Sequence, residues 1–451
     1  MKKILLIFTY FLVFGFGCTF AQTEKLTEKE NKFLDTLQYK TFLYFINEVN
    51  FNNGLVRDRS TKESPASMAA TGFAIPVWAI GVEHNWITIE QARDLTLNLF
   101  IFLLNSEQSE KEDATGYEGL YYHFVDINTG KRMWNCELST IDTGLLLAGI
   151  RFAVQYFSSD NPKDIEIRKL GDKITNRVNW NFTCVSEEGN FKSTISMSWD
   201  PKDKLSKVGW HGYNEALIMY VLAAGSNYTN INEAYNNWLK PYIFDEPYEG
   251  LKHILFPPLF GHQYSHIFID FRNIYDEYTD SINIDYFENS RRAVYTQQKY
   301  AIENPYKFVG YDSLTWGITA CDGPGQPYNT PEHKFEYYSG RGTSGAKYNY
   351  FDDGTIAPTA AAASIAFAPE IVTPTIINMY EKYGNKGLWG KYGFVDAFNP
   401  TAGWFAKDYI GIDQAPIVLM IENYRNGFVW NYCKKDPVIK KGLEVLKFRG
   451  R

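Results

Sequence analysis

Residues 134–149, WNCELSTIDTGLLLAG, decide the fold, because they join an aromatic, polar loop to the start of an apolar helix. Ser139 and Asp142 match the S-x-x-D capping box, in which a hydroxyl and a carboxylate satisfy amides of the first helical turn. The apolar run that follows predicts a helix over residues 139–157. Glu137 lies outside the box, beside Trp134, so this stretch places two carboxylates at the mouth of one helix.

Loops rich in Gly, Trp, Tyr and His that run into helices recur along the chain. Helical periodicity and capping patterns predict helices over residues 29–49, 66–84, 88–104, 139–157, 162–178, 213–224, 230–240, 284–302, 357–367, 371–383, 415–425 and 436–447. Long loops are expected over residues 108–138, 181–212, 254–282, 304–356 and 385–414. Loops of this length in a compact domain are usually functional.

Paired helices with long aromatic loops at one end predict an all-α fold. We expect an (α/α)6 barrel, a toroid of six helical hairpins, with a few short strands in the loops, for instance over residues 120–125. An α-solenoid is the alternative, but the sequence has no repeat of about 30–50 residues, which solenoids usually show. Because no linker or shift in composition divides the mature chain, residues 22–451 are expected to form a single domain.

Residues 1–21 have the pattern of a bacterial signal peptide, with Lys2 and Lys3, a long apolar run and the small residue Ala21 at its end. A lipoprotein signal with acylation at Cys18 is the less favoured alternative, since Phe16 stands where a small residue is preferred. A periplasmic or secreted protein is therefore expected. Beyond the signal, no run of about 18 apolar residues predicts a membrane span.

The amino-acid composition indicates which classes of partner the protein can bind. The net charge is −7 and no Lys/Arg cluster is present, which disfavours nucleic acid. Cysteines 136, 184, 321 and 433 are widely spaced without a C-x-x-C pair, so no metal site is predicted and disulfides stay open. Phosphate-binding and dinucleotide motifs are missing from the sequence, and we expect no cofactor. The aromatic content of 17% suits stacking on sugar rings as well as core packing, and a monomer is expected.

The leading catalytic candidate is Glu215, in GWHGYNEALIMY (residues 209–220), where a second aromatic loop enters a helix. Trp210, His211 and Tyr213 would desolvate this carboxylate and raise its pKa, which suits it to protonate a leaving-group oxygen near neutral pH. Its alternative role is to complement the helix dipole. Asp142 and Glu137 are the other catalytic candidates, although Asp142 can equally serve only as a helix cap.

A third stretch, GHQYSHIFIDFR (residues 261–272), contains His262 and His266 four residues apart. This spacing can hold zinc on a helix, but the glutamate of H-E-x-x-H and a third ligand are missing. Hydrogen bonds to sugar hydroxyls, or a structural pair of Asp270 with Arg272, are therefore favoured over a metal.

Three further loops have the same character. Trp316 offers a platform for a sugar ring beside Asp322. Asp352 and Asp353 precede an Ala-rich helix, and their alternative role is to form a turn. Pro416 at the first helical position would leave Asp413 and Gln414 free at the helix mouth, unless Asp413 caps the helix. Together, the expected substrate contacts are Trp134, Trp210, His211, Tyr213, His262, Tyr264, His266, Asp270, Arg272, Trp316, Asp322, Asp413 and Gln414.

Six long motifs stand out along the chain: YYHFVDINTGKRMWNCELSTIDTGLLLAG (121–149), GHQYSHIFIDFRNIYDEY (261–278), WGITACDGP (316–324), DDGTIAPTAAAASIAFAPE (352–370), YGFVDAFNP (392–400) and GIDQAPIVLMIENYRNGFVW (411–430). With these motifs the chain resembles the bacterial glycoamylase-like domain and, more closely, glycoside hydrolase family 144. The resemblance implies an (α/α)6 barrel and inverting, endo-acting hydrolysis of β-1,2-glucan to short sophorooligosaccharides. It also implies that Glu215 is the general acid and that Glu137 and Asp142 are acidic positions of the cleft. The general base stays open among Asp142, Glu137, Asp322 and Asp413.

Three alternatives remain. The chain could be an exo-acting or other β-glucan hydrolase of the same fold. It could be a polysaccharide lyase using Tyr264, His262 or His266, and Arg272 beside a uronate, although an acidic chain lacks the cationic cleft that a polyuronate needs. It could also be a non-catalytic surface protein that only binds glycan.

Overall fold

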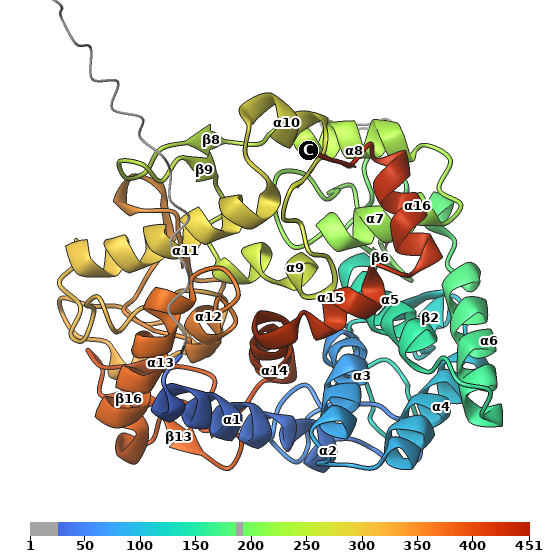
Figure 1. Cartoon of the computed structure of the whole chain (residues 1–451), viewed down its shortest axis with the longest axis horizontal. Helices are drawn as coiled ribbons and strands as arrows, with labels where there is room; N and C mark the ends of the chain where they lie inside the picture. The colour runs from blue at the N-terminus through green and yellow to red at the C-terminus, as the bar shows by residue number, and fades with distance from the viewer. Residues whose placement is uncertain (1–25, 186–192) are drawn as a thin grey trace, which may run out of the picture.

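The computed structural model describes residues 26–185 and 193–451, and the predicted signal peptide lies outside these ranges. Helices dominate the described residues, so the prediction of a mainly helical chain is confirmed (Figure 1). Within these ranges, none of the helices has the length and apolar character needed to cross a membrane. The cysteines of the described residues are free thiols.

One set of helices lies toward the middle of the molecule and is largely buried (Figure 1). Mostly apolar sequences of this kind are typical of helices enclosed by other helices. Along the set, α3 packs on α5, α5 on α7, α7 on α9, α12 on α14, and α14 back on α3. Gln263, just before α9, donates a hydrogen bond of 2.8 Å to the Ala360 carbonyl of α12. The members of this inner set are α3 (Met68–Glu83), α5 (Thr140–Tyr156), α7 (Leu217–Gly225), α9 (Tyr264–Phe268), α12 (Pro358–Ala362) and α14 (Gly411–Asn426).

The closest packing in the inner set is between α3 and α5. A Cβ atom on Gly149 of α5 would lie only 2.0 Å from the carbonyl oxygen of Gly72 on α3. A larger side chain at either position would therefore push the two helices apart.

A second set of helices surrounds the first and alternates with it along the chain (Figure 1). α1 packs on α14, α4 on α3, α6 on α5, α8 and α16 on α7, and α13 on α12. Capping boxes start α1 at Thr27 and α4 at Thr88. This outer set comprises α1 (Glu28–Phe42), α4 (Ile89–Asn105), α6 (Pro162–Arg177), α8 (Ile231–Leu239), α11 (Tyr286–Glu303), α13 (Pro369–Tyr383) and α16 (Pro437–Val445). Short helices α2 (Tyr44–Asn47), α10 (Glu277–Ile282) and α15 (Phe428–Cys433) complete the described helices.

The connecting loops contain short antiparallel strands. One sheet has the order β2-β3-β5-β6-β7, and it pairs Tyr121 with Ser139 and Leu138 with Trp199. This sheet holds the segment that enters α5, and β3 and β4 fall in the strand region predicted over residues 120–125. The strands are β1 (Ala66–Ser67), β2 (Gly116–Tyr117), β3 (Leu120–Tyr122), β4 (Phe124–Val125), β5 (Leu138–Ser139), β6 (Ser198–Asp200), β7 (Lys204–Leu205), β8 (Phe244–Asp245), β9 (His253–Ile254), β10 (Ile274–Tyr275), β11 (Gly342–Thr343), β12 (Asn349–Phe351), β13 (Trp389–Gly390), β14 (Gly393–Phe394), β15 (Phe398–Asn399), β16 (Trp404–Phe405) and β17 (Arg449–Gly450).

Three predicted boundaries need correction. α7 begins at Leu217, so Glu215 lies in the turn before it, where the Asn214 side chain accepts a hydrogen bond from the Ala216 amide. α14 begins at Gly411, because the Ile410 carbonyl already accepts from the amides of residues 413 and 414, and Pro416 is therefore inside the helix rather than at its first position. α9 and α10 occupy a region predicted as loop, since helices of five or six residues are too short to show periodicity.

Candidate active site

Acidic side chains gather where helices of the inner set begin. Asp142 is in the first turn of α5, Glu215 precedes α7, and Asp413 is in the first turn of α14. Their charges act on one another: Asp142 raises the pKa of Glu215, and both Asp413 and Glu215 raise that of Tyr264, the first residue of α9. These four side chains, three from helices and one from the turn before α7, therefore lie at one end of the inner set.

The backbone of Glu215 is fixed by the neighbouring helix. Ser265 of α9 donates to the Glu215 carbonyl at 2.9 Å and accepts from the Ile218 amide at 3.0 Å, replacing the missing cap of α7. The Glu215 side chain is half-buried, and its Oε2 has no hydrogen-bond partner among the described residues. Burial, with a contribution from Asp142, raises the pKa of Glu215 to about 7. A carboxyl of this kind can donate a proton near neutral pH.

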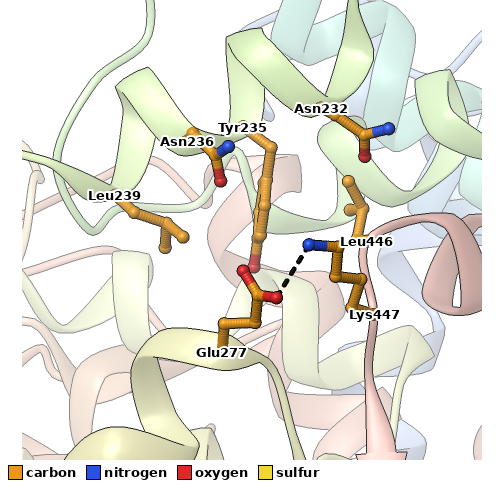
Figure 2. Close-up of a pocket in the computed structure, with 7 residues that line it drawn as sticks. All are labelled: Asn232, Tyr235, Asn236, Leu239, Glu277, Leu446 and Lys447. Atoms are coloured by element: carbon orange, nitrogen blue, oxygen red, sulfur yellow. Dashed lines mark hydrogen bonds and ion pairs between the residues drawn. The ribbon is translucent and has the colours of Figure 1, made fainter.

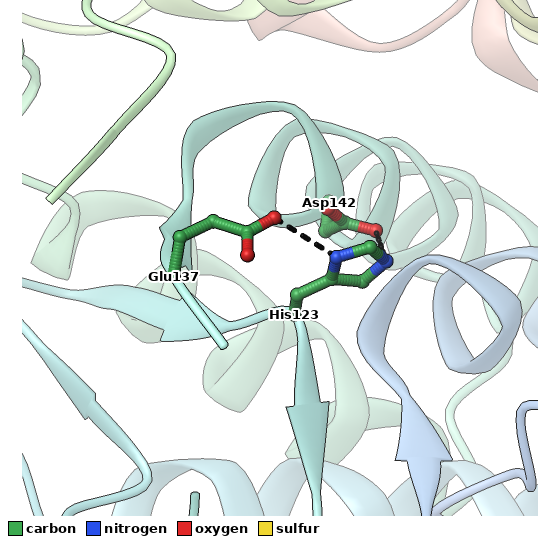
Figure 3. Close-up of side chains that lie close together, drawn as sticks. All are labelled: His123, Glu137 and Asp142. Carbon is green, nitrogen blue, oxygen red and sulfur yellow. Dashed lines mark hydrogen bonds and ion pairs between the residues drawn. The ribbon is translucent and has the colours of Figure 1, made fainter. Parts of the chain in front are cut away.

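His123 joins the two carboxylates of the opening stretch (Figure 3). Its Nδ1 lies 3.0 Å from Oε1 of Glu137, and its Nε2 lies 3.6 Å from Oδ1 of Asp142. Ser139 caps α5 as predicted, through a 3.1 Å bond from the Asp142 amide. The Asp142 carboxylate, however, accepts a hydrogen bond from the Ser139 hydroxyl and not from the Ser139 backbone amide, so the second half of the capping box is not formed.

The His123 cluster also has the composition of a cation site. The ligand atoms of His123, Glu137 and Asp142 lie within 4.8 Å of one another. A histidine binds a metal through the lone pair of a neutral ring. Here both ring nitrogens face carboxylates, which is the arrangement expected of a protonated ring. The geometry therefore fits an ion-paired cluster better than a metal site.

A second group of carboxylates surrounds Arg59. The Arg59 guanidinium lies 3.0 Å from Asp322, 3.4 Å from Asp58 and 3.6 Å from Asp408. A backbone bridge from Arg59 to Ile410 places this group beside the start of α14. Burial raises the pKa of both Asp58 and Asp322, although Arg59 opposes the shift.

Asp396 and Asp413 form a buried acidic pair next to this group. Asp396 accepts a hydrogen bond of 2.7 Å from the Asp322 amide. Burial and the charge of Asp322 raise the pKa of Asp396 to about 7, while burial and Asp396 raise that of Asp413 well above its ordinary range. Two buried carboxyls whose charges act on each other bind protons as a coupled pair.

Exposed aromatic side chains flank the carboxylates. Trp134 is 59% exposed, and its ring meets the edge of Phe124, which stacks on His123. Tyr338 is 56% exposed, but burial of its hydroxyl and then the charges of Asp413 and Asp396 raise its pKa, so the hydroxyl lies near the acidic pair. Both rings are therefore exposed to solvent near the carboxylate site.

Several expected substrate contacts are wrong, because the structure buries them. Trp210 donates to Thr140 at 2.9 Å, and Trp316 donates to Thr375 at 2.9 Å, so neither indole offers a free face. Tyr213 stacks on Tyr286 in the core.

The two histidines of the third stretch are buried as well. His262 contacts the Phe256 carbonyl at 3.1 Å and His266 contacts Ser290 at 3.0 Å. Burial lowers the pKa of both rings, which are therefore neutral core residues.

The remaining expected contacts differ in position. Asp270 and Arg272 pair with each other at 2.6 Å beyond the other end of α9, where Arg272 also lies over Trp430, so the structural alternative is confirmed for this pair. Gln414 is buried and donates to the Phe394 carbonyl at 3.1 Å, and the His211 ring contacts its neighbour Gly209 at 2.7 Å. The structure thus brings together Glu215, Asp142, Glu137, Tyr264, Asp322 and Asp413, with Trp134 at the rim.

Six residues of this site were not predicted from the sequence: Asp58, Arg59, His123, Tyr338, Asp396 and Asp408. His123 and Asp396 lie inside motifs that carry the family resemblance, which could have drawn attention to them. Asp58 and Arg59 lie in VRDRS (residues 56–60), which has no recognisable pattern.

A separate small pocket lies on the outer set, between α8, α10 and the C-terminal segment (Figure 2). Glu277 and Lys447 form an ion pair of 2.7 Å across it. Both side chains are exposed, and no residue of the carboxylate site lines the pocket, so we assign it no role in the chemistry.

Comparisons with known proteins point to one group of enzymes. The exo β-1,2-glucooligosaccharide sophorohydrolase (non-reducing end) of Parabacteroides distasonis is 29% identical over 95% of this chain, which spans 59% of the length of that protein. The endo-β-1,2-glucanase of Chitinophaga pinensis, solved with sophorotriose and glucose, superposes with a TM-score of 0.79 at 25% identity, covering 94% of this chain and 99% of the other.

The β-1,2-glucanase structure of Parabacteroides distasonis gives a TM-score of 0.79 at 27% identity, covering 94% of this chain and 60% of the other. The model of the glycoamylase family, described as "Putative glucoamylase", matches residues 207–437. Because this match spans more than half of the chain and agrees with the motifs that resemble glycoside hydrolase family 144, the chain belongs to the glycoamylase family.

Proposed function

We propose that this protein is an exported, inverting endo-β-1,2-glucanase in which Glu215 is the general acid. The observation that carries the proposal is the half-buried Glu215 carboxyl, which has a pKa of about 7 and an oxygen without a partner among the described residues. The relatives that act on β-1,2-glucan supply the substrate class.

The fold proposed for this activity is the (α/α)6 barrel. Outer and inner helices alternate from α1 to α14. The inner helices α5, α7 and α14, whose starts carry Asp142, Glu215 and Asp413, begin at the same end of the inner set. Such a barrel would open its cleft at this end, where the carboxylates and the exposed rings of Trp134 and Tyr338 lie.

In the proposed reaction, Glu215 protonates the departing glycosidic oxygen while a carboxylate across the sugar ring activates a water molecule. Inverting enzymes hold the two carboxyls about 6.5–9.5 Å apart, or farther if a proton relay intervenes. Glu137 and Asp142 both lie beside His123, and Asp322 lies beside Arg59, so a cationic neighbour does not separate these candidates. We favour Asp142 as the base, because its charge is the one that acts on Glu215, and Glu137 would hold it in place through His123.

The two histidines and the arginine that a lyase would use do not suit that reaction. His262 and His266 are neutral and buried, and Arg272 lies beyond the opposite end of α9. A lyase would need a base and a cation beside one uronate, and the carboxylate site offers mainly negative charge.

Digestion of β-1,2-, β-1,3- and α-1,4-glucans, followed by thin-layer chromatography, tests the proposal. We expect only β-1,2-glucan to be shortened, first to a range of oligosaccharides; immediate release of disaccharide alone would indicate exo action. Proton NMR should show the α-anomer as the first product. Glu215→Gln should lose roughly 10²–10⁴-fold in activity, whereas Glu233→Gln, on the exposed face of α8, should not. Near-normal activity of a folded Glu215→Gln variant would refute the assignment.

A further inference from the structure

The His123 ring occupies an unusual position between two acidic side chains of the site (Figure 3). Glu137 approaches Nδ1 at 3.0 Å and Asp142 approaches Nε2 at 3.6 Å. A neutral imidazole has only one N–H group and one lone pair. It could satisfy one of these carboxylates but would turn a lone pair toward the other, so only the imidazolium form suits both.

Asp142 needs this cation because it is almost fully buried, with 4% of its surface exposed. A buried carboxylate without compensation takes up a proton. Burial raises the pKa of Asp142, and the groups that oppose this shift are the His123 ring, the Ser139 hydroxyl and the backbone of Asp142 itself. Glu137 adds a further negative charge to the same pocket.

We propose that His123 is a positioning residue which, as an imidazolium, holds Glu137 and Asp142 in place and keeps Asp142 ionised beside Glu215. The proposal rests on the proposed function, because it takes Asp142 and Glu215 as parts of one hydrolytic site. Its consequence is that His123, which itself does not touch the reacting atoms, lowers the pH at which Asp142 takes up a proton and thereby extends the active range of the enzyme to lower pH.

Electrostatics around the ring supports this role. Burial alone would lower the pKa of His123, but Asp142, Glu137 and Asp58 raise it to about 9. These groups come from three separate segments: α5, the loop before β5, and the loop before β1. Burial opposes ionisation of Glu137, yet the hydrogen bond from His123 lowers the pKa of that carboxyl below its ordinary value.

Variant kinetics separate this role from a purely structural one. His123→Gln should lose more kcat/KM relative to the wild type at pH 5.5 than at pH 8, and the two losses should differ at least tenfold. The reason is that Asp142 in the variant takes up a proton at a higher pH than Asp142 in the wild type. A loss that is equal at all pH values would overturn the proposal. His84→Gln is the matched control, because His84 pairs with Glu422 at 2.8 Å, away from the carboxylate site. It should not change the pH profile.

NMR of ring-labelled histidine tests the same inference without activity. The His123 signal, identified by its loss in His123→Gln, should titrate with a midpoint above pH 8 and should move down by a pH unit or more in Glu137→Gln. A midpoint near 6.5 or below would overturn the proposal, as would a shift of this signal on adding zinc or calcium to EDTA-treated protein, which would reveal a cation site. If the wild type cleaves no glucan, the proposed function fails, while this titration still decides whether His123 holds the two carboxylates.

Discussion

Asp142 lies close enough to Glu215 for its negative charge to add to the effect of burial on the Glu215 carboxyl. The two residues come from different helices of the inner set, α5 and the turn before α7, and these helices pack directly on each other. Packing of two apolar helices therefore sets the distance between the proposed acid and its nearest charged neighbour. The relationship predicts how each residue should change the behaviour of the other.

Asp142→Asn should lower the pKa of Glu215 from its value of about 7, because the variant keeps the burial but removes the negative charge. The wild-type kcat/KM should fall as the pH rises through about 7, and the variant's residual activity should fall at a lower pH. Carbon-13 NMR of labelled glutamate gives a direct measurement, with the Glu215 signal identified by its loss in Glu215→Gln. An unchanged midpoint in Asp142→Asn would show that the two carboxyls do not interact.

Glu215→Gln should stabilise the fold at pH 8 but not at pH 4. The pKa of Glu215 is raised on folding from 4.5 to about 7, so the native state binds the proton more tightly than the unfolded state. The stability that this group contributes is present below pH 4.5 and is lost as the pH rises through 7. Replacing it with a neutral amide should therefore raise the free energy of unfolding at pH 8 by roughly 1–3 kcal/mol.

Chemical denaturation at the two pH values measures this difference. Glu233→Gln, on the exposed face of α8, serves as the control and should change stability little at either pH. A Glu215→Gln protein less stable than the wild type at pH 8 would mean that the ionised carboxylate is favourably bound in the fold.

The helices were largely predictable from sequence because long helices display their buried face in the spacing of apolar residues. α4, α5 and α6 follow the predicted ranges closely. Thr88 caps α4 and Ser139 caps α5. α9 was missed, since five residues cannot establish a period, although it carries Ser265 and Tyr264 into the site.

The site itself was only partly predictable. Acidic residues at helix starts, such as Asp142 and Asp413, follow from local patterns. Aromatic residues do not reveal from sequence whether a ring is exposed, and Trp316 and Trp134 look alike in their loops although one is buried and the other open. Arg59 and Asp322 are far apart in the chain, and their pairing depends on the assembled fold.

Trp134 and Trp316 should respond differently to substitution. Trp134→Ala removes an exposed ring and should raise KM by roughly 3–10-fold, as expected for the loss of a stacking contact of about 0.5–1.5 kcal/mol, with little change in Tm. Trp316→Phe removes a buried hydrogen bond to Thr375 and should lower the free energy of unfolding by about 1–2 kcal/mol without changing KM. Kinetics on β-1,2-glucan and thermal unfolding measure both. A raised KM in Trp316→Phe would contradict the core position of this ring.

Asp396→Asn should make the fold less sensitive to alkaline pH. Burial and Asp322 raise the pKa of Asp396 from 3.8 to about 7, and Asp413 lies beside it. Protonation of this pair thus stabilises the native state at low pH, and that stability is lost as the pH rises through about 7. An asparagine keeps an acceptor for the Asp322 amide and can donate to Asp413 without bringing a second charge. The Tm of the variant relative to the wild type should therefore increase from pH 5 to pH 8.

Asp353→Asn is the control, because removing this charge is expected to destabilise the fold. Asp353 is as buried as Asp396, but Arg341 binds both its oxygens at 2.8 Å, and although burial acts to raise its pKa, this pairing lowers it below the ordinary value. Removing its charge leaves a buried guanidinium without its partner, so Asp353→Asn should lower Tm at both pH values. Equal pH dependence of Tm in Asp396→Asn and the wild type would show that Asp396 and Asp413 do not bind protons as a coupled pair, and that each titrates independently of the other.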